Sequence, residues 1–236
     1  MASVSHAVLS SIGGSVNGND SFTKILLHMD GSNGGTVFTD SAAGGGPKTW
    51  TAGGTGNTST AASKFGGSSL ACGAGAGWIS TPDSVNFTLG ANNWTVDCWF
   101  NRQGGDGTRR IIFGQGSAAA GGSVIYMELD VANKLYGFST TSGAAITGTT
   151  VITTTGWHHA ALVRTGNTMK MFLDGVQEGG DVAVSGTLVD STQNLSIGRL
   201  GDYAPLNWNG YIDEFRLSVG IARWTAGFTP PTSAYS

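Results

Sequence analysis

The sequence predicts an all-β protein built as an antiparallel sandwich or barrel. The 236-residue chain contains 39 glycines, and only 11% of its residues are charged. Its polar positions are mostly Thr, Ser, Asn and Gly, which favour strands and turns over helices. Short apolar segments also recur with turn signals about every 8–12 residues, a spacing typical of sandwiches and barrels.

The first half of the chain predicts one clear strand and a long irregular tract. Residues 24–30 form the first strand, and residues 31–77 form a glycine-rich tract of short strands between loops. Isolated apolar residues anchor that tract. Residues 93–102 then alternate apolar and polar, which places Trp94, Val96, Cys98 and Phe100 on one face of a strand.

The second half predicts a series of hairpins. Residues 123–130 pair with residues 134–138 across a turn at 131–133. The Asp174-Gly175 dipeptide is the strongest hairpin signal in the chain, because both residues accept positive φ. The other expected strands are 111–113, 157–164, 169–173, 195–198 and 211–218. Residues 223–231 lack periodicity and end in prolines, so we expect a packed loop there.

The chain divides most simply into residues 1–21, an extended N-terminal arm, and residues 22–236, one large domain. The arm lacks the periodicity to fold alone, so we expect it to order on a partner. A domain of this size needs no disulfide, which predicts that Cys72 and Cys98 are reduced and buried.

Charge and hydropathy exclude two classes of partner. The formal net charge is −3 and the basic residues are scattered, so we expect no nucleic-acid binding. No apolar run approaches the roughly 20 residues of a membrane span. The N-terminus has neither the basic start nor the apolar core of a signal peptide, which predicts synthesis in a cytoplasm.

Four motifs in order resemble laminin-G-like domains of the concanavalin A-like lectin/glucanase group. They are Trp94-Thr-Val-Asp-Cys-Trp-Phe100, Gly156-Trp-His-His159, Phe172-Leu-Asp-Gly-Val176 and Tyr211-Ile-Asp-Glu-Phe-Arg-Leu217. The resemblance covers about residues 22–235. It implies a two-sheet antiparallel jelly roll and a recognition or structural module.

The two ends of the domain resemble such domains in bacteriophage structural proteins, at residues 26–31, 38–41 and 219–231. This resemblance implies a non-enzymatic virion protein, made in the host bacterial cytoplasm, that decorates or extends the capsid or tail surface. Other virion proteins would bind the N-terminal arm, and self-association is a further expectation. The alternative is a glycan-binding lectin module, on a virion or secreted by a bacterium.

The glucanases of this group carry two catalytic glutamates, and a retaining mechanism needs two carboxyls about 5–5.5 Å apart. The chain offers Glu128 and Asp130, but Asn133 stands where an acid/base carboxylate is needed. We therefore expect a protein without enzymatic activity.

No cofactor is required, but the resemblance implies a structural calcium near the ends of the first and last strands. Asp30, Asp40, Asp213 and Glu214 are the candidate oxygen ligands. The alternative is that Asp30 and Asp40 cap turns while Glu214 pairs with an arginine such as Arg216.

A glycan ligand would need an aromatic ring to stack on and amides to bond hydroxyls. The loop 202–209 is the best candidate, with Tyr203, Asn207 and Trp208 as the binding residues. The alternative is that Trp208, like most loop tryptophans, covers the edge of the core.

Overall fold

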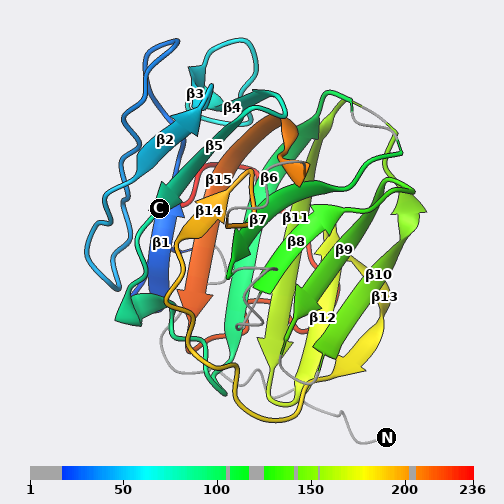
Figure 1. Cartoon of the computed structure of the whole chain (residues 1–236). Helices are drawn as coiled ribbons and strands as arrows, with labels where there is room; N and C mark the ends of the chain where they lie inside the picture. Colours follow the sequence, from blue (N-terminus) through cyan, green and yellow to red (C-terminus); the bar gives the residue numbers. More distant parts are fainter. Residues whose placement is uncertain (1–17, 105–106, 117–124, 141–142, 154, 202–205) are drawn as a thin grey trace, which may run out of the picture.

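The computed structural model describes residues 18–104, 107–116, 125–140, 143–153, 155–201 and 206–236. Strands of these residues form two antiparallel sheets that pack face to face (Figure 1). Within these ranges no helix is long and apolar enough to cross a membrane. The predicted all-β sandwich is confirmed.

Sheet A carries the C-terminal strand at its centre. In spatial order it contains β13 (Val176–Ala183), β12 (Thr168–Leu173), β11 (Trp157–Thr165), β6 (Trp94–Arg102), β15 (Asn209–Val219), β4 (Ser69–Ala74) and β3 (Asn57–Ser59), and β1 (Thr23–Leu27) also pairs with β15. Sheet B contains β10 (Ala144–Val151), β9 (Lys134–Ser139), β8 (Ile125–Leu129), β7 (Arg110–Gln115), β14 (Leu195–Ile197), β5 (Gly77–Thr81) and β2 (Thr51–Gly54). A short 3₁₀ helix, Val85–Phe87, precedes β6.

The core lies between the sheets, where inward residues of each strand meet. The predicted face of β6 is confirmed, since Trp94, Val96, Cys98 and Phe100 all belong to the main core cluster. Cys72 and Cys98 are buried and unbonded to each other, as expected. Burial raises the pKa of the Cys72 thiol far above its usual range, so this thiol packs as a small apolar group.

The closing strand β15 contains a bulge that changes which side chains face inward. Its register with β6 shifts between Asp213 and Arg216, and Glu214 has a φ of 48°. Ile212 and Phe215 therefore both point into the core, although they are three residues apart. Arg216 is turned to the outer face of sheet A, opposite Asp97 of β6.

The C-terminal segment 221–236 covers the outer face of sheet A, as predicted for a packed loop. Trp224 and Phe228 stack with ring centroids 4.1 Å apart and pack on Ala161, Val163 and Phe172. Gly175 of the β12–β13 hairpin has a φ of 79°, and a Cβ there would lie 1.8 Å from the carbonyl oxygen of Phe228. The hairpin glycine is thus required both by its turn and by the segment above it.

A buried ion pair lies beneath this segment. Arg216 Nε and Nη2 donate to the two carboxylate oxygens of Asp97 at 3.0 and 3.2 Å, and neither side chain is exposed. The Tyr235 hydroxyl also donates to Asp97, and the Tyr235 ring lies 3.8 Å from the guanidinium carbon of Arg216. The end of the chain is therefore attached to the sheet through this pair.

The start of the described chain is held at the same place. Arg223 donates to Asp20 and Thr23, and the amide of Asn19 donates to the carbonyl of Ser236. Residues 18–21, which the sequence assigned to the arm, are therefore bonded to the domain. Residues 1–17, the rest of the predicted arm, lie outside the described residues.

On the side where β13 and β10 end the two sheets, one carboxylate joins them. Glu178 of β13 is only 3% exposed, and it accepts bonds from the backbone amides of Thr149 and Thr150 in β10. Gly148 and Gly179 lie against this contact with little space beside them. The open side of the sandwich is closed there by a side chain.

We predict that Asp97→Asn destabilises the protein by about 3–5 kcal/mol, because it leaves the buried Arg216 charge without a counter-charge. Urea unfolding measures the change. Asp181→Asn, in the exposed Lys170–Asp181 pair, is the control and should leave the midpoint unchanged. Equal midpoints for Asp97→Asn and the parent protein would contradict the role of the pair.

The same carboxylate predicts a pH dependence. Burial alone would raise the pKa of Asp97, but the Arg216 charge and hydrogen bonds from His159 and Tyr235 lower it from 3.8 to about 2. The resulting stabilisation, about 2 kcal/mol, is complete above pH 4 and is lost as the pH falls through 2. The difference in unfolding free energy between the parent protein and Asp97→Asn should therefore shrink across this range. A constant difference would contradict the lowered pKa.

Candidate functional site

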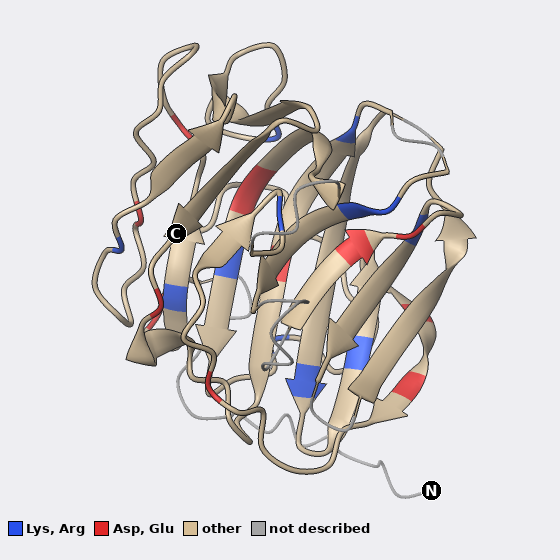
Figure 2. Cartoon of the chain, in the orientation of Figure 1, with Lys and Arg blue, Asp and Glu red and all other residues tan. Residues whose placement is uncertain are grey.

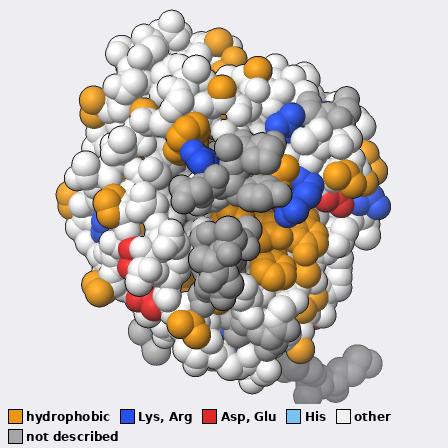
Figure 3. All heavy atoms as spheres, viewed as in Figure 1, with side chains coloured by type: hydrophobic (Ala, Val, Ile, Leu, Met, Phe, Trp, Pro, Cys, Tyr) orange, Lys and Arg blue, Asp and Glu red, His pale blue; other side chains and the backbone are white. Residues whose placement is uncertain are grey.

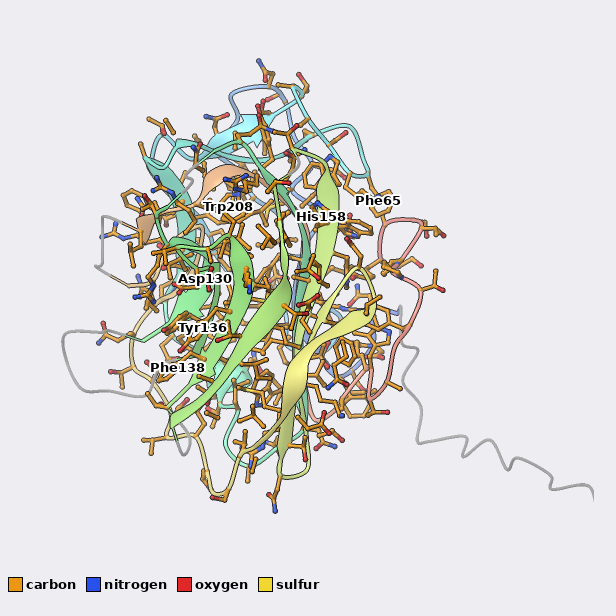
Figure 4. All side chains as sticks on the ribbon, turned by 90° about the vertical axis from the view of Figure 1, so that its right-hand side faces the viewer. Phe65, Asp130, Tyr136, Phe138, His158 and Trp208 are labelled. Atoms are coloured by element: carbon orange, nitrogen blue, oxygen red, sulfur yellow. The ribbon has the colours of Figure 1, made fainter. Side chains whose placement is uncertain are left out.

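The outer face of sheet B carries a group of partly exposed aromatic side chains on β8 and β9. Inward residues of these strands are Ile125, Met127, Leu129 and Leu135, so the residues between them face outward. In Figure 4, Tyr136 and Phe138 lie on one side of the sandwich and Phe65 on the other. Sheet A is covered on its outer face, whereas Tyr126, Tyr136 and Phe138 remain half-buried.

Strand register arranges the outward residues in two rows. The first row runs Gly114, Tyr126, Phe138 and Ala145 across β7 to β10. The second runs Ile111, Glu128, Tyr136 and Thr147. Directly opposed residues have Cβ atoms about 4.5–5.5 Å apart, so neighbours in each row are in contact.

The three rings form one surface, which we name the aromatic platform. Tyr126 stacks on Phe138 with centroids 5.2 Å apart, and Tyr136 lies 6.0 Å from Tyr126. Ile111 and Leu200 are buried beside this surface, and Tyr126, Phe138 and Leu206 pack against them. Figure 3 shows hydrophobic side chains gathered on this face beside basic residues.

A hollow of about 280 Å³ opens on the platform. Polar and apolar side chains line it together. They are Arg109, Tyr126, Glu128, Asp130, Val131, Tyr136 and Thr147. Apolar walls with a few placed polar groups are typical of small-molecule sites.

Glu128 lines the hollow and is only 2% exposed. Its Oε1 accepts a bond of 2.7 Å from Arg109 Nε, while Oε2 has no hydrogen-bond partner among the described residues. Burial raises the pKa of this carboxyl, and the Arg109 guanidinium partly opposes the rise. Arg109 Nη2 also donates to the Tyr126 hydroxyl at 3.2 Å, and burial raises the Tyr126 pKa to about 12.

Asp130 has a structural bond. Its Oδ1 accepts the backbone amides of Ala132 and Lys134 at 2.8 and 2.9 Å, which holds the β8–β9 turn. Asn133 has a φ of 58° in that turn. The predicted hairpin is confirmed where it is described, by the pairing of β8 with β9, while residues 123 and 124 lie outside the described residues. The turn brings Val131 to the rim of the hollow.

The described residues of the predicted glycan loop, 206–209, do not form an exposed binding surface around Trp208. Tyr203 lies outside the described residues. Trp208 is completely buried and meets Phe100 edge-to-face at 5.5 Å, so its ring offers no face to a ligand. Asn207 is 4% exposed and its carbonyl accepts a bond from Arg110. Trp208 therefore follows the alternative interpretation, in which the tryptophan packs with the core.

The candidate calcium ligands do not converge in the described part of the chain. Asp40 accepts the amides of Leu26, Ala42 and Lys48, so it caps a turn, as the alternative supposed. Asp213 Oδ2 accepts the amides of Lys64 and Phe65 and holds a loop. The described residues contain no group of three or more His, Cys, Asp or Glu side chains placed to hold a metal.

The remaining two candidates also differ from expectation. Glu214 pairs with His28 at 2.9 Å, not with Arg216, and its carboxylate accepts the Tyr235 amide. Asp30 is exposed near that pair, and burial nevertheless raises its pKa. Calcium binding by Asp30 and Asp213 stays a prediction.

The aromatic platform was not predicted from the sequence. The signal was present, because pairing β8 with β9 in register sets Tyr126 opposite Phe138 and Glu128 opposite Tyr136. A loop tryptophan, Trp208, was chosen instead, and its large apolar ring packs in the core.

The family model of the concanavalin A-like lectin/glucanases superfamily, of laminin G type, matches residues 73–220, which is more than half of the chain. The chain belongs to this superfamily. No curated protein sequence matches it. Among solved structures, domain 4 of AbnA, an extracellular arabinanase from Geobacillus stearothermophilus solved with arabinotriose, is 18% identical with a TM-score of 0.62. The match covers 85% of this chain and 93% of that one.

Toxin binding domains share the fold as well. The binding domain of Paraclostridial Mosquitocidal Protein 1 is 10% identical with a TM-score of 0.64, covering 85% of this chain and 49% of that one. Botulinum neurotoxin type C, whose cell entry depends on two ganglioside molecules, is 12% identical with a TM-score of 0.60, covering 83% and 47%. The chain thus spans about half the length of these toxin domains, and these likenesses show the fold alone.

We predict that Arg109→Gln raises the pKa of Glu128 further, because the variant removes the guanidinium that stabilises the ionised carboxylate. NMR titration of the Glu128 carboxyl carbon measures it. Lys170→Gln, which breaks the exposed pair with Asp181, is the control and should leave the Glu128 pKa unchanged. An unaltered Glu128 titration in Arg109→Gln would show that the pair does not act on this carboxyl.

Proposed function

We propose that this protein is a glycan-binding module whose ligand lies on the aromatic platform of sheet B. The observation that carries the proposal is the hollow over Tyr126, Tyr136 and Glu128, where half-buried rings lie beside a buried carboxylate. A sugar ring has an apolar C–H face and a rim of hydroxyls. The platform offers apolar area to that face, and the polar groups offer hydrogen bonds to that rim.

The two outer faces of the sandwich support this placement. Sheet A is covered on its outer face by residues 221–236, which leaves Trp224 only 6% exposed. Sheet B keeps half-buried rings on its outer face, next to the exposed Val131 and Thr147. The solved relatives that carry glycan ligands, such as the arabinanase domain with arabinotriose, share the same sandwich and favour a binding role.

The site suits binding better than hydrolysis. A glycosidase of the usual two-carboxylate type needs a second carboxyl free to act as nucleophile or acid/base. In this hollow, Glu128 is paired with Arg109, and Asp130 holds the β8–β9 turn. Although one solved relative is a domain of a glycoside hydrolase, the proposal is a non-catalytic module.

Placement on a bacteriophage particle stays a separate prediction that depends on the resemblance of the chain ends. Attachment through the arm would fall on residues 1–17, because residues 18–21 are already bonded to the domain. A glycan-binding module would serve such a particle by contacting the host surface.

We predict that Tyr136→Ala weakens glycan binding by about tenfold or more, because it removes a stacking ring worth about 1.4 kcal/mol. A glycan array identifies ligands, and calorimetry measures their Kd. Tyr136→Phe keeps the ring and should retain most of the affinity.

The control is Tyr211→Ala, which truncates a partly exposed tyrosine on the other sheet and should bind normally. Equal losses in Tyr211→Ala and Tyr136→Ala, or no loss in either, would remove the platform as the binding site.

A further inference from the structure

Glu128 lines the hollow, and its carboxylate has an unused acceptor, Oε2, among the described residues. Only 2% of the surface of Glu128 is accessible, and Oε2 has no hydrogen-bond partner among the described residues. A buried acceptor left unpaired costs about 1–3 kcal/mol, and more when it is charged. A ligand hydroxyl that displaces the side chains over Oε2 and donates to it would recover this cost.

The position of Glu128 matches a ligand on the platform. In the second row, Glu128 and Thr147 lie on either side of Tyr136. A sugar ring over Tyr136 therefore has a carboxylate at one edge and a hydroxyl at the opposite edge. Hydrogen bonds to a charged acceptor contribute more than neutral ones, so the Glu128 edge should dominate recognition.

The charges lining the hollow oppose an acidic ligand. Its ionisable groups include two carboxylates, Glu128 and Asp130, against one guanidinium. Two donors of that guanidinium, Nε and Nη2 of Arg109, already bond Glu128 and Tyr126. Lys134 begins β9 but does not line the hollow. A ligand carboxylate would thus meet like charges with few free donors to balance them.

Resting on the proposed function, we infer that the hollow selects neutral glycans, with Glu128 Oε2 accepting a ligand hydroxyl and Asp130 repelling acidic sugars. Glu128 would be the residue that determines specificity, and the aromatic platform would supply the part of the affinity that depends little on which sugar is bound.

The test uses the full chain on a glycan array of matched pairs, each a neutral oligosaccharide and the same oligosaccharide bearing a uronate or sialate. Lactose with its sialylated form is one such pair. The parent protein should bind neutral members at least about tenfold more tightly than their acidic partners. Tighter binding of the acidic members would overturn the inference.

Two variants separate the contribution of the Glu128 acceptor from the repulsion by Asp130. Glu128→Gln should weaken binding of neutral members by about 5- to 100-fold, as expected for loss of a charged acceptor. Asp130→Asn keeps an acceptor for the turn amides, so it should stay folded, and it should raise the affinity for acidic members relative to that for neutral members. Thermal melting checks the fold of each.

Unchanged neutral affinity in Glu128→Gln, or an unchanged neutral-to-acidic ratio in Asp130→Asn, would contradict the inference while Tyr136→Ala still supports a glycan site. Absence of binding to every array member would remove the proposed function, and this inference with it.

Discussion

The ion pair of Asp97 and Arg216 is the interaction on which the outer layer of this protein depends. Both side chains are fully buried on the outer face of sheet A, and burial of two charges is tolerated only because they bond each other in a bidentate arrangement. Tyr235 completes the bonding of Asp97 and ties residues 221–236 to the sheet. The pair, in turn, needs the bulge at Glu214 that turns Arg216 outward.

This arrangement makes the two sides of the sandwich unequal. On sheet A, Thr95 of β6 and Ser218 of β15 accept hydrogen bonds from Arg223 of the C-terminal segment, which also donates to Asp20. On sheet B, the outward residues of β8 and β9 have no such cover from the described chain, and they form the aromatic platform. Figure 2 shows Lys and Arg scattered over the ribbon, so the contrast between the faces concerns packing more than overall charge.

Much of the fold could be predicted from local patterns. The alternation of β6 places four apolar residues in the core, and Asp174-Gly175 forms the predicted hairpin with positive φ at both residues. The extents of β10 and β13 were not predicted, since Ala144–Val151 contains two alanines and a glycine, and Val176–Ala183 contains two adjacent glycines. These strands form by pairing with β9 and β12, a tertiary effect that outweighs their weak propensity.

The site was harder to predict because its members act through register across strands. Tyr126, Tyr136 and Glu128 become a group only when β8 and β9 pair, while Trp208 looked exposed in its loop but packs in the core. The calcium hypothesis grouped carboxylates by chain position near strand ends, whereas Asp40 and Asp213 each bond backbone amides. A carboxylate beside a turn is often satisfied by that turn.

The carboxylate of Glu178 has a consequence for how molecules of this protein meet one another. An edge strand normally presents unpaired amides that template the strand of a second chain, which is a route to aggregation. In β10, Glu178 occupies the amides of Thr149 and Thr150 within the same molecule. Intermolecular strand addition at that edge would first have to displace a buried carboxylate, so this edge is protected from fusing with a second copy into a continuous sheet.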